Sequence, residues 1–382
     1  MPHEGLLPPR YDRSGLAGVL PAVATSLGVP GYGASGDHWL PEARRSVVVL
    51  VDGLGYELLR RRGGHAPFLR SLLPAAHRIT AGFPATTATS MGTFGTGLPP
   101  GSHGLLGYEV LVPGEDRLVN ELSWEDGPDP VAWQPQDTVF EVAERAGVSV
   151  TRVGPGFFDG SGLTRAALRG GRFRAADTMA ERVDASLAAV RASARSLVYL
   201  YWGELDKVGH VHGCQSWEWG DELEAIDAEL RRLVASVPAD TSVHITADHG
   251  MVDAPHALRI DLAHDAELAA GIRHVGGEPR ALQLYCEEGA AEDVGQTWAE
   301  RVGERAWIRT REQAVREGWF GPVREVNLPR IGDVVVAMRQ NFAIVDSRRA
   351  RPQLLALLGL HGSLTPEESA VPWFHVPARD NA

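Results

Sequence analysis

The sequence predicts an α/β protein with a mostly parallel central sheet and helices on both of its faces. Two observations support this fold class. Short apolar segments rich in β-branched residues recur along the chain, and segments with helical periodicity separate them. Continuous apolar runs of this length are typical of parallel strands that are buried on both faces. Alternation of strands and helices then favours one open sheet covered by helices.

The expected strands are short. They are predicted at residues 46–51, 148–153, 196–202 and 242–247. Helical periodicity predicts helices over 138–147 and 216–237, and the second is charged on one side, as a covering helix is. Ahead of the first strand, apolar residues at helical spacing predict an amphipathic surface helix over 14–27, bent at Pro21.

We expect one catalytic domain over residues 1–382, with two departures from the sheet. Residues 108–136 are rich in Pro, Gly, Asp and Trp without clear periodicity, which predicts an irregular excursion. Residues 252–345 mix a strand pattern, RALQLYC, with a helical pattern, EDVGQTWAERVG. They are therefore predicted to form a smaller inserted α+β subdomain that acts as a cap.

Composition excludes several functional classes. Hydrophobic residues make up 44% of the chain, yet no apolar run approaches the roughly 20 residues that a membrane helix needs. The net charge of −12 argues against binding to nucleic-acid polymers, which requires a basic surface. The first 33 residues lack a secretory-signal pattern, and the chain has only two cysteines. We therefore expect a soluble cytoplasmic protein that does not bind membranes.

Metal-ligand residue types follow three of the predicted strands. They are Asp52 after the first strand, Glu204, Asp206 and His210 after the third, and Asp248 and His249 after the fourth. Ligands of open α/β sheets gather at the carboxyl ends of the strands. Each group alone also fits an ordinary structural role, as a turn, a surface pair or a helix cap. Three such groups at three strand ends favour a metal site.

The spacing within two of these groups suits metal ligation. Asp206 and His210 are four residues apart, so on a helix their Cβ atoms lie about 5–6 Å apart on one face. Asp248 and His249 precede Gly250, where the backbone turns easily. Carboxylate and imidazole ligands without thiolates suit zinc, with manganese or iron as alternatives.

Five motifs together resemble the alkaline phosphatase superfamily, and most closely its nucleotide pyrophosphatase/phosphodiesterase branch. They are VDGLG, TTATSMGTFGTGLPPGSHG, ELDKVGH, TADHGM and LHGSL, in the order of the family, between residues 46 and 364. The resemblance implies two divalent metal ions, zinc first. It would place one on Asp52, Asp248 and His249, and the other on Asp206, His210 and His361.

The resemblance also implies a nucleophile at the start of a helix, nine residues before the threonine of a closing Thr-Gly pair. Counting back from Thr96 places it at Thr87, with Thr86 and Thr89 as the alternative hydroxyls. A rival alignment on Phe83-Pro84 would place Gly82 there, which has no nucleophilic group. The helix N-terminus would favour both an alkoxide and a bound phosphate.

The reaction implied by the resemblance is hydrolysis of phosphodiester or pyrophosphate bonds in a small-molecule substrate such as a nucleotide. It would proceed through a covalent phosphothreonine intermediate in two displacements at phosphorus. A phosphomonoesterase or phosphonate hydrolase is the alternative, and a non-catalytic metal-binding protein is a further one. No Lys or Arg adjoins Thr87, which favours singly charged diesters. Sulfatases need a cysteine or serine where Thr87 stands.

One residue departs from the family pattern. Tyr108 occupies the position of an asparagine that contacts a phosphate oxygen in the diesterase branch. We expect residues 108–136 and 252–345 to select the substrate. Of the remaining candidates, Trp124 and Trp133 are expected either in the core or stacked on the substrate, and His103, His212 and Glu204 are expected to support the site rather than to bind metal.

Overall fold

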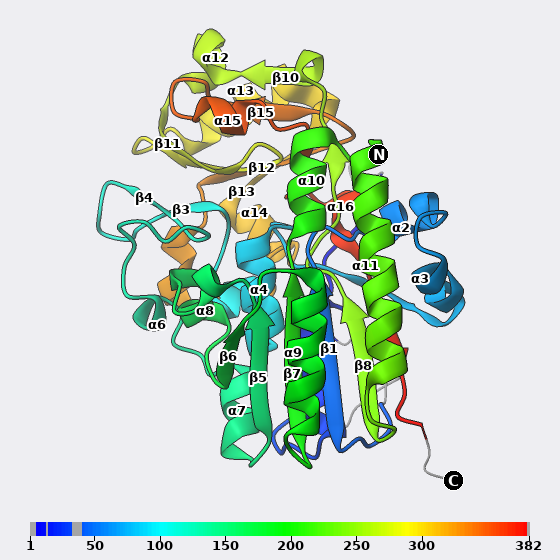
Figure 1. Cartoon of the computed structure of the whole chain (residues 1–382). Helices are drawn as coiled ribbons and strands as arrows, with labels where there is room; N and C mark the ends of the chain where they lie inside the picture. Colours follow the sequence, from blue (N-terminus) through cyan, green and yellow to red (C-terminus); the bar gives the residue numbers. More distant parts are fainter. Residues whose placement is uncertain (1–4, 13, 33–39, 380–382) are drawn as a thin grey trace.

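The protein is described by a computed structural model that covers residues 5–12, 14–32 and 40–379. Parts of the N-terminal stretch that lacks a secretory-signal pattern, residues 1–4, 13 and 33, lie outside the described residues. Figure 1 shows a central sheet with helices packed around it and a smaller layer above its upper edge. Within the described residues, none of the helices is both long and apolar enough to cross a membrane.

The central sheet has seven strands in the order β2-β17-β8-β1-β7-β5-β6. In chain order they are β1 (Arg45–Val51), β2 (His77–Thr80), β5 (Ser149–Gly154), β6 (Arg172–Ala175), β7 (Ser196–Trp202), β8 (Thr241–Thr246) and β17 (Ala370–Val376). All pairings are parallel except those of β17, which runs antiparallel to both of its neighbours. The four strands predicted from sequence are confirmed as β1, β5, β7 and β8.

Helices cover both faces of this sheet, as the sequence predicts. In the view of Figure 1, α9 (Met179–Arg191) and α11 (Trp217–Ser236) lie in front of the sheet. On the other face, the Tyr199 ring of β7 contacts Phe94 of α4 (Thr87–Thr96) and Phe140 of α7 (Val139–Arg145). The predicted helices 138–147 and 216–237 correspond to α7 and α11.

The predicted helix over 14–27 differs from the structure in two ways. A 3₁₀ turn at Leu16–Gly18 precedes α1 (Val19–Ser26), so residues 14–27 do not form one continuous α-helix. Pro21 lies in the first turn of α1, where its missing N–H needs no helical partner. The helix is also more buried than a surface helix, because it packs against α4 and α7.

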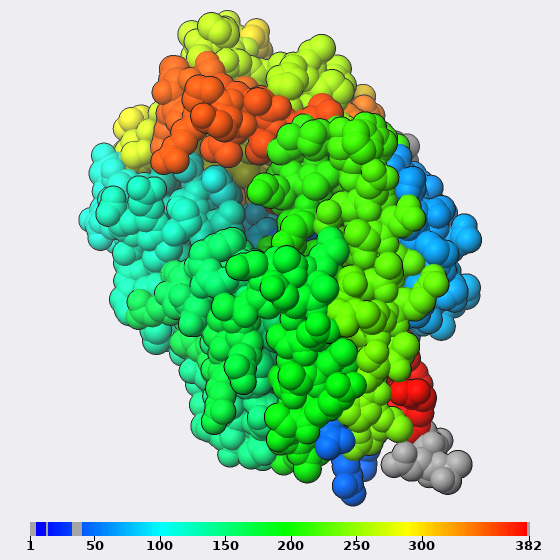
Figure 2. Space-filling model, in the orientation of Figure 1, coloured from blue at the N-terminus to red at the C-terminus, as the bar shows by residue number. Residues whose placement is uncertain are grey.

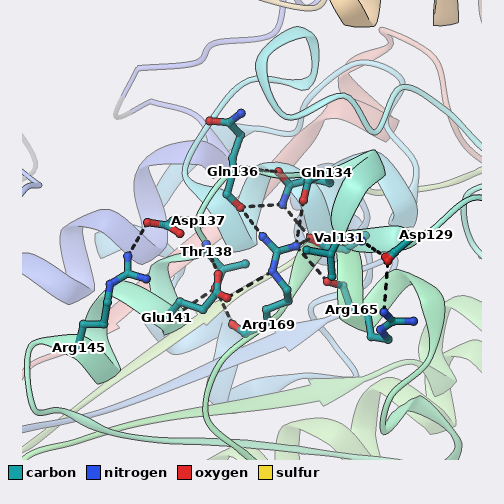
Figure 3. Close-up of polar contacts among 11 residues, drawn as sticks. Asp129, Val131, Gln134, Gln136, Asp137, Thr138, Glu141, Arg145, Arg165 and Arg169 are labelled. Atoms are coloured by element: carbon teal, nitrogen blue, oxygen red, sulfur yellow. Dashed lines mark hydrogen bonds and ion pairs between the residues drawn. The ribbon is translucent and has the colours of Figure 1, made fainter.

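Residues 108–136 are mostly irregular but contain a short hairpin, β3 (Glu109–Leu111) and β4 (Leu118–Asn120), and the one-turn helix α6 (Pro130–Trp133). Figure 3 shows how the end of this segment is held. The Arg169 guanidinium donates to the backbone carbonyls of Gln134 and Gln136, and the Thr138 hydroxyl donates to the carbonyl of Arg169. These bonds fix the excursion to the start of α7.

The inserted segment forms its own four-stranded antiparallel sheet in the order β11-β12-β14-β13. Its main elements are β11 (Ile272–Glu278), β12 (Ala281–Cys286), α13 (Ala291–Val302), β13 (Ala306–Thr310), α14 (Arg311–Arg316) and β14 (Val334–Met338). A hydrophobic cluster around the fully buried Trp298 of α13 packs against one face of this sheet. The segment lies above the upper edge of the central sheet in Figure 1, and Figure 2 shows a recess beneath it.

Shorter elements connect these layers. They are α2 (Tyr56–Arg62), α3 (Pro67–Leu72), α5 (Pro100–His103), α8 (Gly162–Ala167), α10 (Glu204–His212), β9 (Val252–Asp253), β10 (Arg259–Asp261), α12 (Ala266–Ala269), β15 (Ala343–Val345), α15 (Pro352–Leu355), β16 (Gly359–Leu360) and α16 (Pro366–Ser369). Of these, α10 carries Asp206 and His210, and β16 directly precedes His361.

Candidate metal centre

Three adjacent strands bring the predicted ligands together. β8, β1 and β7 are neighbours in the sheet and run parallel, so their carboxyl ends meet at one edge. Asp52 directly follows β1, and its N–H extends the ladder by donating to the carbonyl of Trp202 at 2.8 Å. Asp248 follows β8, and Asp206 lies in the first turn of α10 after β7. His361 reaches the same edge from the end of β16.

The ligand atoms of these residues form two groups. Asp52, Asp248 and His249 form one, and Asp206, His249 and His361 form the other, with all ligand atoms of a group within 4.8 Å of one another. His249 belongs to both groups, and its ring stacks on that of His361 with centroids 3.7 Å apart. His210 joins the second group through Asp206, with its Nε2 3.2 Å from a carboxylate oxygen.

The three histidines share one hydrogen-bonding pattern. In each, Nδ1 faces a backbone carbonyl: that of Gly359 for His210 at 2.7 Å, that of Gly250 for His249 at 3.0 Å, and that of Ala85 for His361 at 3.0 Å. A carbonyl can only accept, so Nδ1 carries a proton in each ring, and Nε2 is the atom that each ring turns towards the carboxylates. This is the arrangement of metal-ligating histidines, whose second nitrogen is fixed by a hydrogen bond.

The carboxylates show that the site suits cations. One oxygen each of Asp52, Asp206 and Asp248 is buried and has no hydrogen-bond partner. Buried polar atoms of native proteins are almost always paired, so these three oxygens indicate a group that the protein alone does not supply. Oxygen and imidazole donors of this kind bind divalent metal ions such as zinc and manganese.

The pKa shifts of the three carboxyl groups also indicate a site for cations. Burial raises the pKa of Asp52, and the neighbouring Asp248 and Asp206 raise it further. Burial also raises the pKa of Asp248, against the opposing effect of His249. For Asp206, burial is outweighed by three histidines, chiefly His210, which hold its pKa below the ordinary value. Bound dications would offset the repulsion among these carboxylates.

Thr87 is the first residue of α4, and its side chain faces the first ligand group. Its Oγ1 lies 3.2 Å from His249 Nε2 and 3.5 Å from an Asp52 carboxylate oxygen. Thr86, the residue before it, has extended backbone angles and ends the preceding loop. The hydroxyl therefore stands at a helix N-terminus, where backbone N–H groups favour negative charge.

Most neighbouring hydroxyls are engaged in packing bonds. The Ser90 hydroxyl donates to the carbonyl of Asp248 at 2.9 Å, Thr93 pairs with His103 at 3.0 Å, and Thr96 donates to the carbonyl of Gly92 at 2.6 Å. Thr89 is fully buried and its hydroxyl has no partner. Of the three candidate hydroxyl residues Thr86, Thr87 and Thr89, Thr87 is the one that is partly exposed.

Other candidates lie beside the site rather than in it. Glu204 accepts two hydrogen bonds from the buried Arg182, at 2.6 and 2.7 Å, and belongs to neither ligand group. His103 is buried beside α4, whereas His212 is exposed near Glu218. Trp124 and Trp133 are buried, so they pack in the core instead of facing a substrate.

Sequence reasoning missed two residues of the site. Tyr201 donates from its hydroxyl to Asp52 at 2.5 Å, which fixes that carboxylate. Glu278, the last residue of β11, reaches down from the inserted segment to within 3.6 Å of His361 Nδ1. Tyr201 stands in a strand pattern and Glu278 in a turn pattern, so neither carries a local signal of a metal site.

Comparison with known proteins gives a family match over most of the chain. The model of the family described as type I phosphodiesterase / nucleotide pyrophosphatase matches residues 46–364. A comparison with curated proteins found no match.

Two of the solved structures with a similar fold are the following. An inactive threonine-to-alanine variant of murine ectonucleotide pyrophosphatase / phosphodiesterase 5, in complex with AMP, has a TM-score of 0.70 and 18% identity, and the match covers 88% of this chain and 90% of that chain. Phosphonoacetate hydrolase from Sinorhizobium meliloti 1021, in complex with phosphonoformate, has a TM-score of 0.67 and 19% identity, covering 91% of this chain and 94% of that chain.

Proposed function

Because the chain belongs to the type I phosphodiesterase / nucleotide pyrophosphatase family, we propose that it hydrolyses phosphodiester or pyrophosphate bonds of small molecules such as nucleotides at a two-metal site. Membership makes it a metal-dependent phosphoric ester hydrolase. We propose, beyond this, which bond is cleaved, which metal ions are bound and which residue is the nucleophile.

Six residues are proposed to hold the metals. Asp52, Asp248 and His249 would bind one ion, and Asp206, His210 and His361 the other, with zinc as the first candidate and manganese or iron as alternatives. The unpartnered carboxylate oxygens, and the histidine rings whose Nδ1 atoms are held by backbone carbonyls, support this set. When bound, two such cations stabilise negative charge on the attacking and departing oxygens of an in-line displacement.

Thr87 is the proposed nucleophile. Its Oγ1 would bond to phosphorus while the bond from phosphorus to the leaving oxygen breaks and the hydroxyl proton passes to solvent. Water would then cleave the bond between phosphorus and Thr87 and restore the hydroxyl. The observation that carries this proposal is the position of the Thr87 hydroxyl at a helix N-terminus, 3.2 Å from His249. The inactivity of the threonine-to-alanine variant in the murine relative supports a threonine nucleophile.

Diesters fit the charge of the site better than monoesters. In the described part of the chain, histidines are the only basic side chains in ion-pair contact with Asp52, Asp206 and Asp248. A doubly charged monoester would call for further cationic groups around its extra charge. The phosphonate-hydrolase alternative keeps support from the structural likeness to phosphonoacetate hydrolase.

The proposal predicts a metal-dependent preference for diesters. Metal-stripped protein is resupplied with zinc or manganese and assayed on bis(4-nitrophenyl) phosphate and on 4-nitrophenyl phosphate, with Thr87→Ala as the matched variant. We expect hydrolysis of the diester only with metal, and a loss of roughly a thousandfold or more in kcat for Thr87→Ala. Preference for the monoester would contradict the diesterase assignment, and activity retained by Thr87→Ala would contradict the nucleophile.

A further inference from the structure

The inserted segment reaches the metal centre through the turn that joins β11 to β12. Glu278 ends β11, and Arg280 stands in the turn just before β12. The Glu278 side chain is 7% exposed and that of Arg280 is fully buried. Two charged groups of the cap are thus buried beneath it, beside the central sheet.

Glu278 touches the loops that carry two functional residues. One carboxylate oxygen lies 3.6 Å from His361 Nδ1, and the carboxyl group also faces the Thr86 hydroxyl, next to Thr87 in the chain. The fit is close, because a Cβ placed on Gly362 would lie 2.8 Å from the Glu278 carboxyl carbon. Glu278 therefore fills the space between the His361 loop and the start of α4.

The same two loops also contact each other directly. The Ala85 N–H donates to the carbonyl of Gly362 at 2.9 Å, and the carbonyl of Ala85 accepts from His361 Nδ1 at 3.0 Å. Glu278 lies against this junction with its second oxygen buried and without a partner. A buried carboxylate near the like-charged Asp206 is costly unless cations bind close by.

A buried ion pair holds the turn that carries Glu278. Arg280 makes two hydrogen bonds of 2.7 Å to the two carboxylate oxygens of Glu368, and both side chains are fully buried. Glu368 accepts from the Ser363 N–H at 3.0 Å through its carboxylate, and from the Gly250 N–H at 2.7 Å through its backbone carbonyl. One pair thus joins the cap to the segments that follow His249 and His361.

Such a pair is weak support for stability, because desolvation of two charges offsets much of their attraction. The contacts of the Arg280–Glu368 pair instead fix where the turn that carries Glu278 lies relative to the segments that follow His249 and His361. His361 donates its Nδ1–H to the carbonyl of Ala85, and the Glu278 carboxylate, 3.6 Å from the same nitrogen, adds a negative charge beside that N–H. Groups that surround the second nitrogen of a metal-bound histidine in this way orient the ring and make it a stronger ligand. Here that carboxylate belongs to the cap rather than to the central sheet.

We propose that Glu278 is a positioning residue of the metal centre: held by the Arg280–Glu368 pair, it fixes the ring of His361 and thereby sets the affinity for the ion bound by Asp206, His210 and His361. The proposal rests on the proposed two-metal function. It gives the inserted segment a second role beside substrate selection, because the cap completes the surroundings of one metal.

Metal binding tests this role directly. Metal-stripped wild type, Glu278→Gln and Glu278→Asp are titrated with zinc by calorimetry, and Glu287→Gln, which changes an exposed cap glutamate, is the matched control. Wild type and control are expected to bind two ions. Glu278→Gln is expected to lose about 10- to 100-fold in affinity at one of the two sites, with the other unchanged. Glu278→Asp keeps the charge and should recover part of the loss.

The outcomes separate this inference from the proposed function. Two ions bound by Glu278→Gln with wild-type affinities would overturn the inference and leave the two-metal function intact. If the wild-type protein binds no metal, both the inference about Glu278 and the proposed two-metal function are overturned. If Glu278→Gln does not fold, the zinc titration of Glu278→Asp tests the inference. Reduced zinc affinity at one site of Glu278→Asp supports the positioning role, and unchanged affinity at both sites overturns it. Diester hydrolysis by Glu278→Gln should recover with excess zinc, which a general folding defect would not do.

Discussion

The motif resemblance predicts that Tyr108 stands where the diesterase branch has asparagine, and its surroundings suit a hydrogen-bond donor. The ring is half-buried, and burial raises the pKa of its hydroxyl, so the group keeps its proton at neutral pH. Asn120 on the neighbouring strand hydrogen-bonds to the hydroxyl and opposes that rise. An amide that donates to the phenolic oxygen leaves the O–H free to donate elsewhere.

We predict that Tyr108→Phe lowers kcat/KM for the diester by about 10- to 100-fold, because a hydrogen bond to a charged group contributes roughly 1.5–3 kcal/mol. Steady-state kinetics on bis(4-nitrophenyl) phosphate measures the effect. Tyr108→Asn, which introduces the family residue, serves as the comparison. An unchanged kcat/KM in Tyr108→Phe would show that this hydroxyl does not contact the substrate.

The surroundings of His103 lead to a prediction of how the free energy of unfolding depends on pH. Its Nδ1 accepts from the Leu105 N–H at 3.1 Å, and its Nε2 pairs with the Thr93 hydroxyl at 3.0 Å. Burial, together with the charge of Arg330, lowers the pKa of His103 to about 3. A proton on Nδ1 would break the bond to Leu105, so the folded protein keeps this histidine neutral.

Acid should therefore destabilise the protein through His103. Between pH 6.5 and about 3 the unfolded chain binds a proton that the folded chain does not, so the free energy of unfolding falls as pH is lowered. At pH 5 the loss is about 2 kcal/mol. Urea denaturation of metal-stripped protein at pH 8 and pH 5 should show this loss in wild type and less of it in His103→Asn. Equal pH dependence in both would contradict the assignment, and exposed His212→Asn is the control.

The grouping of the proposed ligands could be predicted from sequence for a physical reason. The positions of Tyr201 and Glu278 in the site could not. Residues that follow parallel strands are brought together by the sheet itself, so Asp52, Asp206 and Asp248 could be grouped from the strand pattern alone. Glu278 reaches the centre from a separate sheet, and only tertiary packing places it beside His361. The ligand roles of these residues remain predictions, although the structure brings the side chains together.

At the scale of elements, the four parallel interior strands were predicted, whereas the two edge strands β2 and β6 and the antiparallel interior strand β17 were not. β1 ends in the apolar run VVVLV, and its last six positions are buried, which gives a clear signal. β2 and β6 have four residues each and carry Arg or His. β17 contains Pro372 and runs antiparallel to its neighbours, so its pattern does not match that of a central strand.

The helix that carries Thr87 depends on small residues for its position. A Cβ placed on Gly95 would lie 1.9 Å from the carbonyl oxygen of Ala167 on α8, so the two helices approach closely at this point. We predict that Gly95→Ala lowers the free energy of unfolding by about 1–3 kcal/mol through overpacking. Gly64→Ala is the matched control, because nothing lies within 4 Å of a Cβ placed there.

Urea denaturation curves of Gly95→Ala and Gly64→Ala measure the free energy of unfolding of each variant for comparison with wild type. The control is expected to match or slightly exceed wild type, since alanine restricts the unfolded chain more than glycine does. Equal stability of Gly95→Ala and Gly64→Ala would show that α4 can move away from α8 without cost. The predicted loss would show that the position of the Thr87 helix is set by this contact.

At the scale of the whole molecule, a central sheet supplies the proposed ligands and an inserted segment closes over them. The α/β class with a mostly parallel sheet followed from the alternation of strands and helices and is confirmed. The boundaries predicted for the cap, 252–345, and the expected cytoplasmic location remain predictions. Both cysteines, Cys214 and Cys286, are buried and unpaired in the structure.

The stereochemistry of hydrolysis at phosphorus tests the central claim most directly. A phosphorothioate diester of defined configuration is hydrolysed in ¹⁸O-labelled water by metal-loaded wild type, and the configuration of the product is read by ³¹P NMR. Attack by Thr87 followed by attack of water makes two inversions, so the account predicts retention, and no product from Thr87→Ala. Inversion would mean that water attacks the substrate in a single step, which would contradict a covalent intermediate on Thr87.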